Sequence, residues 1–345
     1  MSEFFTLVLT AVFLVLVFLA SVLFTWLIFC HARKRGWLAI PNERSSHTVP
    51  TPTGGGLAIA VVFLASVVAL GIIGVVEASV GLALAGGGSM VALISWIDGR
   101  RALNARVRIL VHALAAIWVL WVLGGPQSLN IGFTTLSLGV AGSVLGFVWI
   151  VGLSNLYNFM DGIDGLLGSE TVAIGAVAGI LLMLAGRPEL AVVTWILAAG
   201  AAGFLVWNWH PAKIFMGDVG SVLIGFSFAT LAFVSERADA VPVFVWSTLL
   251  LVVLVDAGLS TLRRALKGEK WFEAHRTFGY HQALKFGLTH SQVTLRVIGL
   301  NLIVAAGAFV SFYWPRFLLP AFGVSFVLLS WLWWLIQKRV RFPLV

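Results

Sequence analysis

Long apolar segments limit most strongly what this chain can fold into. A run of about 20 apolar residues is long enough to cross a bilayer as a helix, and such runs follow one another along the whole sequence. Of the 345 residues, 60% are hydrophobic and only 10% are charged. We predict spanning helices at residues 4–29, 55–76, 79–97, 107–123, 137–154, 168–185, 189–206, 218–235, 241–262, 292–312 and 316–337. The chain is therefore predicted to be an all-α polytopic integral membrane protein with about 11 transmembrane helices, forming a single domain over residues 1–345.

The basic residues predict how these spans are oriented. Cytoplasmic loops of membrane proteins retain Lys and Arg, and here 19 of them fall in one set of connections and three in the alternate set. This bias predicts a periplasmic N-terminus, a cytoplasmic C-terminus and a cytoplasmic location for most of the +8 net charge, which would attract anionic headgroups and phosphorylated substrates. The predicted cytoplasmic loops that carry polar residues lie near residues 30–54, 98–107, 155–167, 207–217 and 263–291.

The acidic residues divide along the same map. Those in or beside the predicted cytoplasmic connections are Asp98, Asp161, Asp164, Asp218 and Asp256. Those on the outer side are Glu77, Glu189, Glu236 and Asp239. Acids next to a bilayer are energetically costly and usually functional, so we expect chemistry at the cytoplasmic face.

The densest polar cluster lies within residues 155–165, where two carboxylates and two amides interrupt an apolar chain. Asp161 and Asp164 are three residues apart and would share one face of a helix. Glycines follow both of them and allow a ligand to approach the backbone closely. Carboxylate oxygens are ligands that Mg²⁺ prefers, so this segment is a candidate seat for a hard divalent cation.

Four further segments at the same face carry polar signals. The glycine run at residues 54–56 opens a predicted helix, and its N–H groups suit a phosphate, although a plain flexible loop is the alternative. The arginines of residues 100–108 are either topology determinants or phosphate clamps. Asp218, taken alone, would be a helix N-cap, but the base, the cation and the glycines in the same segment argue against that alternative. The connection of residues 256–282 is unusually long for an idle loop.

Together these segments resemble the polyprenyl-phosphate N-acetylhexosamine-1-phosphate transferase superfamily over about residues 41–285. The specific part is an ordered pair of motifs, NxxNxxDGxDGL at residues 155–166 and FMGDxGS at residues 215–221. The elements PNERSSH at 41–47, PTPxGGG at 50–56 and AHR at 274–276 are most similar to the branch that initiates O-antigen and related envelope glycans.

The resemblance implies transfer of an N-acetylhexosamine 1-phosphate from a UDP-sugar to undecaprenyl phosphate, with release of UMP. It implies an enzyme of the bacterial inner (cytoplasmic) membrane that uses Mg²⁺, with Mn²⁺ as a substitute, and that has membrane lipids but no nucleic acid as partners. A homodimer is compatible with it. The sugar stays open between N-acetylglucosamine, N-acetylfucosamine, N-acetylquinovosamine and others.

Residue by residue, the resemblance assigns the following roles. It implies catalytic roles for Asp98, Asp161 and Asp164, metal binding by Asp161 and Asp218, and substrate binding by Ser46, His47, Asn158, Lys213, His275, Arg276 and His281. Asp98 matches the first acid of a paired-aspartate motif, often proposed as the base acting on the lipid phosphate. Independently of the resemblance, the isolated histidines His112 and His290 are assigned to helix packing or the interface.

The chain departs from the family pattern at two places. Gly99 replaces the second acid of the paired-aspartate motif, and Phe278 stands where a second histidine is common, which displaces that imidazole to His281. Because a lipid phosphate is largely ionised at neutral pH, direct attack on the β-phosphate needs little help from a base, and we prefer it over a double displacement through an aspartyl-phosphate. A transporter or lipid flippase using the same acids, and a catalytically idle homologue, are the alternative readings.

Overall fold

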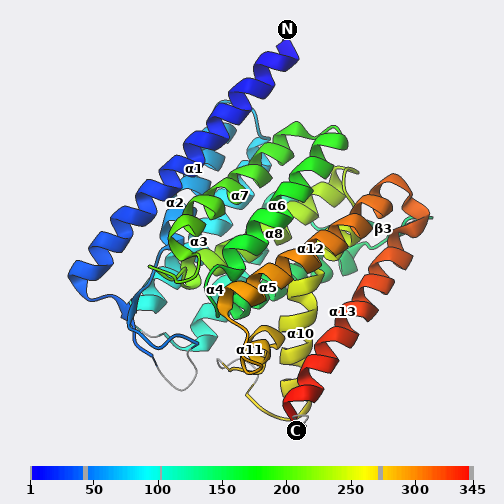
Figure 1. Ribbon diagram of the computed structural model, residues 1–345. Helices are drawn as coiled ribbons and strands as arrows, with labels where there is room; N and C mark the ends of the chain where they lie inside the picture. Colours follow the sequence, from blue (N-terminus) through cyan, green and yellow to red (C-terminus); the bar gives the residue numbers. More distant parts are fainter. Residues whose placement is uncertain (1, 42–45, 102, 271–274, 342–345) are drawn as a thin grey trace.

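The computed structural model describes residues 2–41, 46–101, 103–270 and 275–341 (Figure 1). Its helices are α1 (Ser2–Arg35), α2 (Gly56–Ile72), α3 (Ala78–Arg101), α4 (Ala105–Leu123), α5 (Val140–Met160), α6 (Leu166–Leu184), α7 (Pro188–Asn208), α8 (Asp218–Arg237), α9 (Val243–Leu249), α10 (Leu251–Leu266), α11 (Gly279–Leu284), α12 (His290–Tyr313), the 3₁₀ turn η1 (Pro315–Phe317) and α13 (Leu318–Arg341). Two small antiparallel hairpins pair β1 (Leu38–Ala39) with β2 (Thr51–Pro52) and β3 (Ser128–Asn130) with β4 (Thr135–Ser137).

The prediction of an all-α polytopic membrane protein is confirmed, with a lower number of full spans. Within the described residues, nine helices are long and apolar enough to cross a bilayer, and the pair α9 and α10 adds a tenth if it is counted as one span. The predicted span 241–262 is this pair, which bends by 77°. The predicted span 55–76 is α2, which is only 17 residues long and lies within the bundle.

Helix α8 forms the centre of the bundle, and α1 and α13 lie at its edges (Figure 1). Close approach to α8 depends on small residues, as is usual between membrane helices. A Cβ atom on Gly225 would lie 2.6 Å from the carbonyl oxygen of Leu153 in α5, and one on Gly56 would lie 2.5 Å from Gly220. Side chains larger than hydrogen at these glycines would therefore push α5 and α2 away from α8.

The functional residues predicted from the sequence collect at one end of the bundle. The C-terminal ends of α3, α5 and α7 meet the N-terminal ends of α4, α6, α8 and α12 there, and the short helix α11 lies across this end (Figure 1). At the opposite end, Glu236 has a structural role, because its two carboxylate oxygens accept the backbone N–H groups of Asn130 and Val243, each at 2.6 Å. Glu236 therefore stabilises the structure of its end of the bundle, whereas the acids predicted to be functional lie at the other end.

Candidate functional site

A cavity of about 380 Å³ opens at this end of the bundle. Its walls include eight of the residues predicted from the sequence: Ser46, His47, Asn158, Asp161, Asp164, Asp218, His275 and His281. They come from four separate segments of the chain, which the fold brings together in one cavity. Arg108, Asn208, Phe215, Tyr280 and His290 also line the cavity.

Asp161 and Asp218 form a carboxylate pair in the cavity wall. Asp161 follows the last residue of α5, and its Oδ2 atom accepts the Gly217 N–H at 3.1 Å. Burial, and then repulsion from the Asp218 carboxylate, raise the pKa of Asp161 to about 7. Asp218 is the first residue of α8, but its side chain does not cap that helix. The N-cap interpretation of Asp218 is therefore wrong, and the two acids face a shared space that favours a cation.

Arg108 connects this pair to Asp98. Its Nη1 atom donates to the Asp98 Oδ2 atom at 2.9 Å and to the Asp218 Oδ2 atom at 3.1 Å. The second oxygen of Asp98 accepts the Leu103 N–H at 2.6 Å. The Asp98 side chain is 12% exposed and is not among the residues lining the cavity. In this structure Asp98 holds Arg108 in place and does not itself face the cavity.

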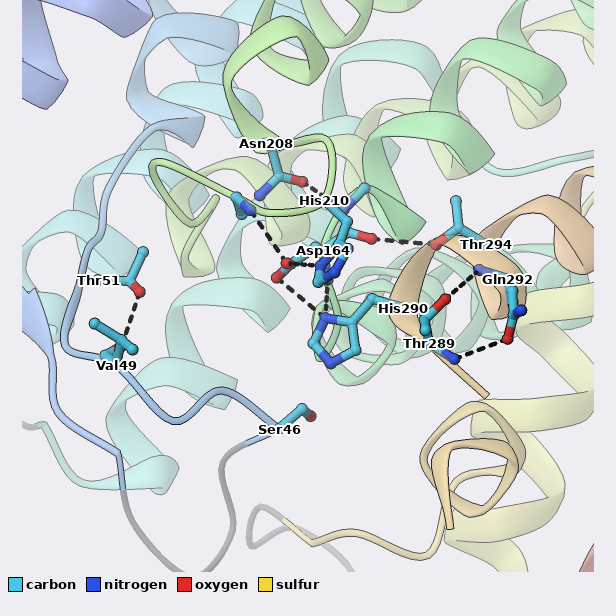
Figure 2. Close-up of polar contacts among 12 residues, drawn as sticks. Ser46, Val49, Thr51, Asp164, Asn208, His210, Thr289, His290, Gln292 and Thr294 are labelled. Carbon is cyan, nitrogen blue, oxygen red and sulfur yellow. Dashed lines mark hydrogen bonds and ion pairs between the residues drawn. The ribbon is translucent and has the colours of Figure 1, made fainter. Parts of the chain in front are cut away.

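Asp164 lies in a contrasting environment, rich in hydrogen-bond donors (Figure 2). Its Oδ2 atom contacts His210 Nδ1 at 2.6 Å and accepts the Ala212 N–H at 3.1 Å, and its Oδ1 atom lies 3.3 Å from His290 Nδ1. Burial alone would raise its pKa, but the contacts with the His290 and His210 rings and the hydrogen bond from the Ala212 N–H outweigh burial and lower the pKa to about 2. Asp164 is therefore a permanent anion at neutral pH.

The same loop is fixed by amide and hydroxyl groups. Asn208 accepts the Gly165 N–H at 3.0 Å and donates to the Ile214 carbonyl at 2.9 Å, joining the loop after α5 to the loop after α7. Thr294 of α12 donates to the Asp164 carbonyl at 3.1 Å (Figure 2). The assignment of His290 to helix packing is wrong, because its ring faces the cavity and contacts Asp164.

Two groups of side chains have the composition of a metal site. Asp161 and Asp218 offer only carboxylate oxygens, and a nearby Asn158 amide adds a polar group. The second group is Asp164 with His210 and His290, whose ligand atoms lie within 4.8 Å of one another. Mg²⁺ selects oxygen ligands, whereas imidazole suits transition metals. The first group therefore fits Mg²⁺ better, since the oxygens of the second are already engaged by imidazole and backbone N–H groups.

Helix α11 and the residues just before it supply an aromatic wall. His275 stacks on Phe278 with ring centres 4.2 Å apart, and Phe278 is parallel to Tyr280 at 5.6 Å. The Tyr280 hydroxyl donates to the Phe159 carbonyl at 2.8 Å. Burial, with Arg264 nearby, lowers the pKa of His275 to about 4, and burial, with Arg276 nearby, lowers that of His281 to about 3. Both imidazoles are neutral at pH 7, so they offer hydrogen bonds and no positive charge.

The loop between α1 and α2 covers another side of the cavity. Ser46 donates to the Gly162 carbonyl at 2.8 Å, and His47 lies edge-on to Phe215 with ring centres 4.8 Å apart. The N–H groups of Gly55 and Gly56 bond the Phe215 and Met216 carbonyls, each at 2.9 Å. The phosphate-binding interpretation of the glycine run is therefore wrong for these two residues, which instead join α2 to the FMGDxGS segment.

Some predicted positions lie away from the cavity or outside the described residues. The ammonium group of Lys213 lies 5.0 Å from the Trp207 ring, and Arg276, whose carbonyl accepts a hydrogen bond from Gln282, is not part of the cavity wall. Residues 42–45 of PNERSSH and residue 274 of AHR fall outside the described residues. Sequence reasoning left Arg108 open between a topology determinant and a phosphate clamp, and it did not place His210 or Asn208 among the site residues. Neither Arg108 nor Asn208 belongs to a motif specific enough to distinguish it from an arginine that sets membrane orientation or from an ordinary loop residue.

A second cavity of about 710 Å³ lies on the other side of α11. Its walls are mainly aliphatic side chains of α10, α12 and α13, and its basic residues are Arg296, Lys338 and Arg339. Tyr280 lines both cavities. Asp256 also lines the second one, where its carboxylate accepts the N–H groups of Gly279 and Tyr280. The short helix α11 thus separates a polar cavity from an apolar one.

Comparison with known proteins gives a consistent assignment. The family model described as glycosyl transferase family 4 matches residues 80–236. The chain is 36% identical over 317 residues to the decaprenyl-phosphate N-acetylglucosaminephosphotransferase of Mycobacterium tuberculosis, covering 83% of this chain and 78% of the relative. It is 28% identical over 289 residues to the probable undecaprenyl-phosphate N-acetylglucosaminyl 1-phosphate transferase of Bacillus subtilis (81% and 78%).

A third relative is the undecaprenyl-phosphate alpha-N-acetylglucosaminyl 1-phosphate transferase of Escherichia coli K12, with 27% identity over 312 residues that cover 87% of this chain and 83% of the relative. The similarity to the relatives extends well beyond residues 80–236, the segment that the family model matches, and that segment spans both NxxNxxDGxDGL and FMGDxGS. The chain belongs to glycosyl transferase family 4, the superfamily of polyprenyl-phosphate N-acetylhexosamine-1-phosphate transferases.

Proposed function

We propose that this protein transfers an N-acetylhexosamine 1-phosphate from a UDP-sugar to undecaprenyl phosphate and releases UMP. The observation that carries the proposal is the meeting of the carboxylate pair Asp161 and Asp218 with Arg108 in one cavity, directly beside an apolar cavity that shares Tyr280. A polar sugar-nucleotide donor and a lipid acceptor need a polar and an apolar cavity next to each other, because they must meet for the transfer.

Asp161 and Asp218 would hold Mg²⁺, which when bound supplies charge neutralisation to the diphosphate of the donor. Together with Asp98 and Arg108 the site has three carboxylates and one guanidinium, so a dication balances its charge when all are ionised. An oxygen of the lipid phosphate attacks the β-phosphorus of the UDP-sugar. The bond from that phosphorus to the bridging oxygen breaks, and UMP leaves with the electron pair.

The other residues of the cavity would position the donor. Asp164 and Asn208 fix the loops beside His210 and His290. We propose that the nucleotide binds in this part of the cavity. The neutral imidazoles of His275 and His281 offer N–H groups to the sugar or diphosphate from the opposite wall.

The acceptor tail would occupy the apolar cavity between α10, α12 and α13. Its aliphatic walls match a polyprenyl chain. Arg296, Lys338 and Arg339 would bind anionic groups at the membrane surface. The distribution of Lys and Arg supports a cytoplasm-facing site in a bacterial inner membrane, and the resemblance of PNERSSH and AHR supports a role in starting O-antigen or a related envelope glycan.

A transporter or flippase is the second candidate, and the position of the acids counts against it. Ion sites of transporters are usually found near the bilayer midplane on broken helices. The bend between α9 and α10 is a break of that kind. However, Asp256 of α10 uses its carboxylate to bind the N-terminus of α11, which is a structural role.

The experiment that tests the proposal is UMP release by purified protein in detergent. The assay contains Mg²⁺, undecaprenyl or decaprenyl phosphate, and a panel of UDP-N-acetylhexosamines. Asp161→Asn is the test variant. Glu189→Gln is its matched control, because Glu189 lies in the first turn of α7, at the end of that helix away from the cavity. We expect release that requires lipid, metal and Asp161 but not Glu189. Absence of release with every donor, from protein shown to be folded, would favour the transporter or the idle homologue.

A further inference from the structure

Arg108 is the one cation of the described residues that contacts two of the candidate catalytic acids. Both contacts use the same atom, Nη1. Among the described residues, Nε and Nη2 have no hydrogen-bond acceptor, although Arg108 lines the cavity and its side chain is 31% exposed. A guanidinium group has five N–H donors in a planar fork. Most of this fork is therefore available to a ligand in the cavity.

The acid that Arg108 shares with the proposed metal is Asp218. Its Oδ2 atom, a candidate metal ligand, accepts the hydrogen bond from Nη1 at 3.1 Å. An arginine and a dication cannot both satisfy the same carboxylate oxygen without repelling each other. Asp98 offers the guanidinium a second carboxylate at 2.9 Å, so Arg108 can leave Asp218 and still keep one ion pair.

Building on the proposed function, we propose that Arg108 occupies Asp218 only while the metal is absent, and that with substrates bound it turns its free N–H groups to a phosphate of the donor or acceptor. Arg binds phosphate through two parallel hydrogen bonds. Asp98, which is largely buried and faces away from the cavity, then acts as the positioning residue that keeps Arg108 beside the reacting phosphates.

This assignment gives Asp98 a role that differs from a base acting on the lipid phosphate. It also accounts for Gly99, because holding one guanidinium requires one carboxylate. A Cβ on Gly99 would meet no atom within 4 Å, so the second acid of the family motif would project into open space and would not reach Arg108 without a change elsewhere.

The test measures metal binding and substrate use separately. Arg108→Ala and Arg108→Lys are compared with the wild type and with Arg106→Ala, an exposed arginine of the same helix turn. Binding of Mn²⁺ is followed by electron paramagnetic resonance in protein without substrates, and UMP release gives KM and kcat. Thermal unfolding shows that each variant is folded.

We expect Arg108→Ala to bind Mn²⁺ on the order of tenfold more tightly, because a competing positive charge is removed, while the KM for the donor or acceptor rises by at least about tenfold. Arg108→Lys should be intermediate in metal binding, since it keeps the charge but loses the fork. Arg106→Ala should match the wild type in both measurements.

Unchanged or weaker Mn²⁺ binding by folded Arg108→Ala would overturn the inference, and so would an unchanged KM for both substrates. These failures differ from failure of the proposed function. If no protein releases UMP but Arg108→Ala still binds Mn²⁺ more tightly, the competition at Asp218 stands and the transferase assignment does not.

Discussion

Asp161 and Asp164 are three residues apart in one loop, yet their carboxyl groups have opposite surroundings. Asp161 accepts one backbone N–H and faces a second carboxylate, and its pKa rises to about 7. Asp164 is contacted by two imidazoles and one backbone N–H, and its pKa falls to about 2. Among the described residues, Asp161 lacks a positive partner, which a bound cation could supply, whereas the charge of Asp164 is already stabilised by groups of the protein.

The two environments indicate two different functions, cation binding and structural support, for acids that belong to one sequence motif. A carboxylate that is destabilised by its neighbours gains free energy when a cation binds. A carboxylate that is fully bonded has little to gain from a metal and instead stabilises the geometry around it. The first is suited to chemistry and the second to keeping two loops and two histidines in place.

The largest expected effect comes from removing Asp161. Asp161→Asn should lower UMP release by roughly a thousandfold or more, because charge neutralisation by the metal is the main device of phosphoryl transfer. Its melting temperature in EDTA should equal or exceed that of the wild type, since a repelled carboxylate is lost. A clear loss of stability would show that Asp161 is as well satisfied as Asp164, and the contrast would fail.

Removing Asp164 should have a smaller effect on turnover and a larger one on stability. Asp164→Asn leaves His210 and Ala212 without their anionic acceptor, which should cost about 1–3 kcal/mol of stability. The KM for the UDP-sugar should rise about 10- to 100-fold with a smaller change in kcat. The measurements are thermal unfolding and UMP release, and Mn²⁺ binding should stay near that of the wild type.

The pH dependence of stability sharpens the comparison further. In metal-free protein the raised pKa of Asp161 contributes stability that is fully present below about pH 4 and is lost as the pH rises towards 7. The lowered pKa of Asp164 has the opposite effect: its contribution is present above about pH 4 and is lost as the pH falls towards 2. Between pH 5 and 8, Asp161→Asn should remove a decline on the order of 1–2 kcal/mol. Thermal unfolding in EDTA over this range measures it. A decline that persists in Asp161→Asn must come from another group.

The smallest effect is expected from restoring the family's second acid. Gly99 lies in α3 with open space around its Cβ position, so Gly99→Asp should fold normally. It should change UMP release by less than about threefold, because the added carboxylate lies outside the cavity wall. A large increase in release would mean that the paired acids act together and that Gly99 limits this chain.

The apolar helices and the polar ends were predictable from the sequence because both depend on composition over long windows. Asp161 and Asp218 were assigned through motifs. The contrast between Asp161 and Asp164 was not predictable, since His210 reaches Asp164 from the loop after α7 and His290 from the start of α12, both far away in the sequence. The bend between α9 and α10 was also missed, because hydropathy does not record a change of helix direction.

The two hydrogen bonds accepted by Asp256 have a consequence for how this chain tolerates mutation. A six-residue helix has no stability of its own, but α11 is tied to the membrane helix α10 by two backbone hydrogen bonds to one carboxylate. Its position is thereby independent of the residues that connect it to α10. Substitutions in that connection should therefore leave Tyr280 in its place between the two cavities.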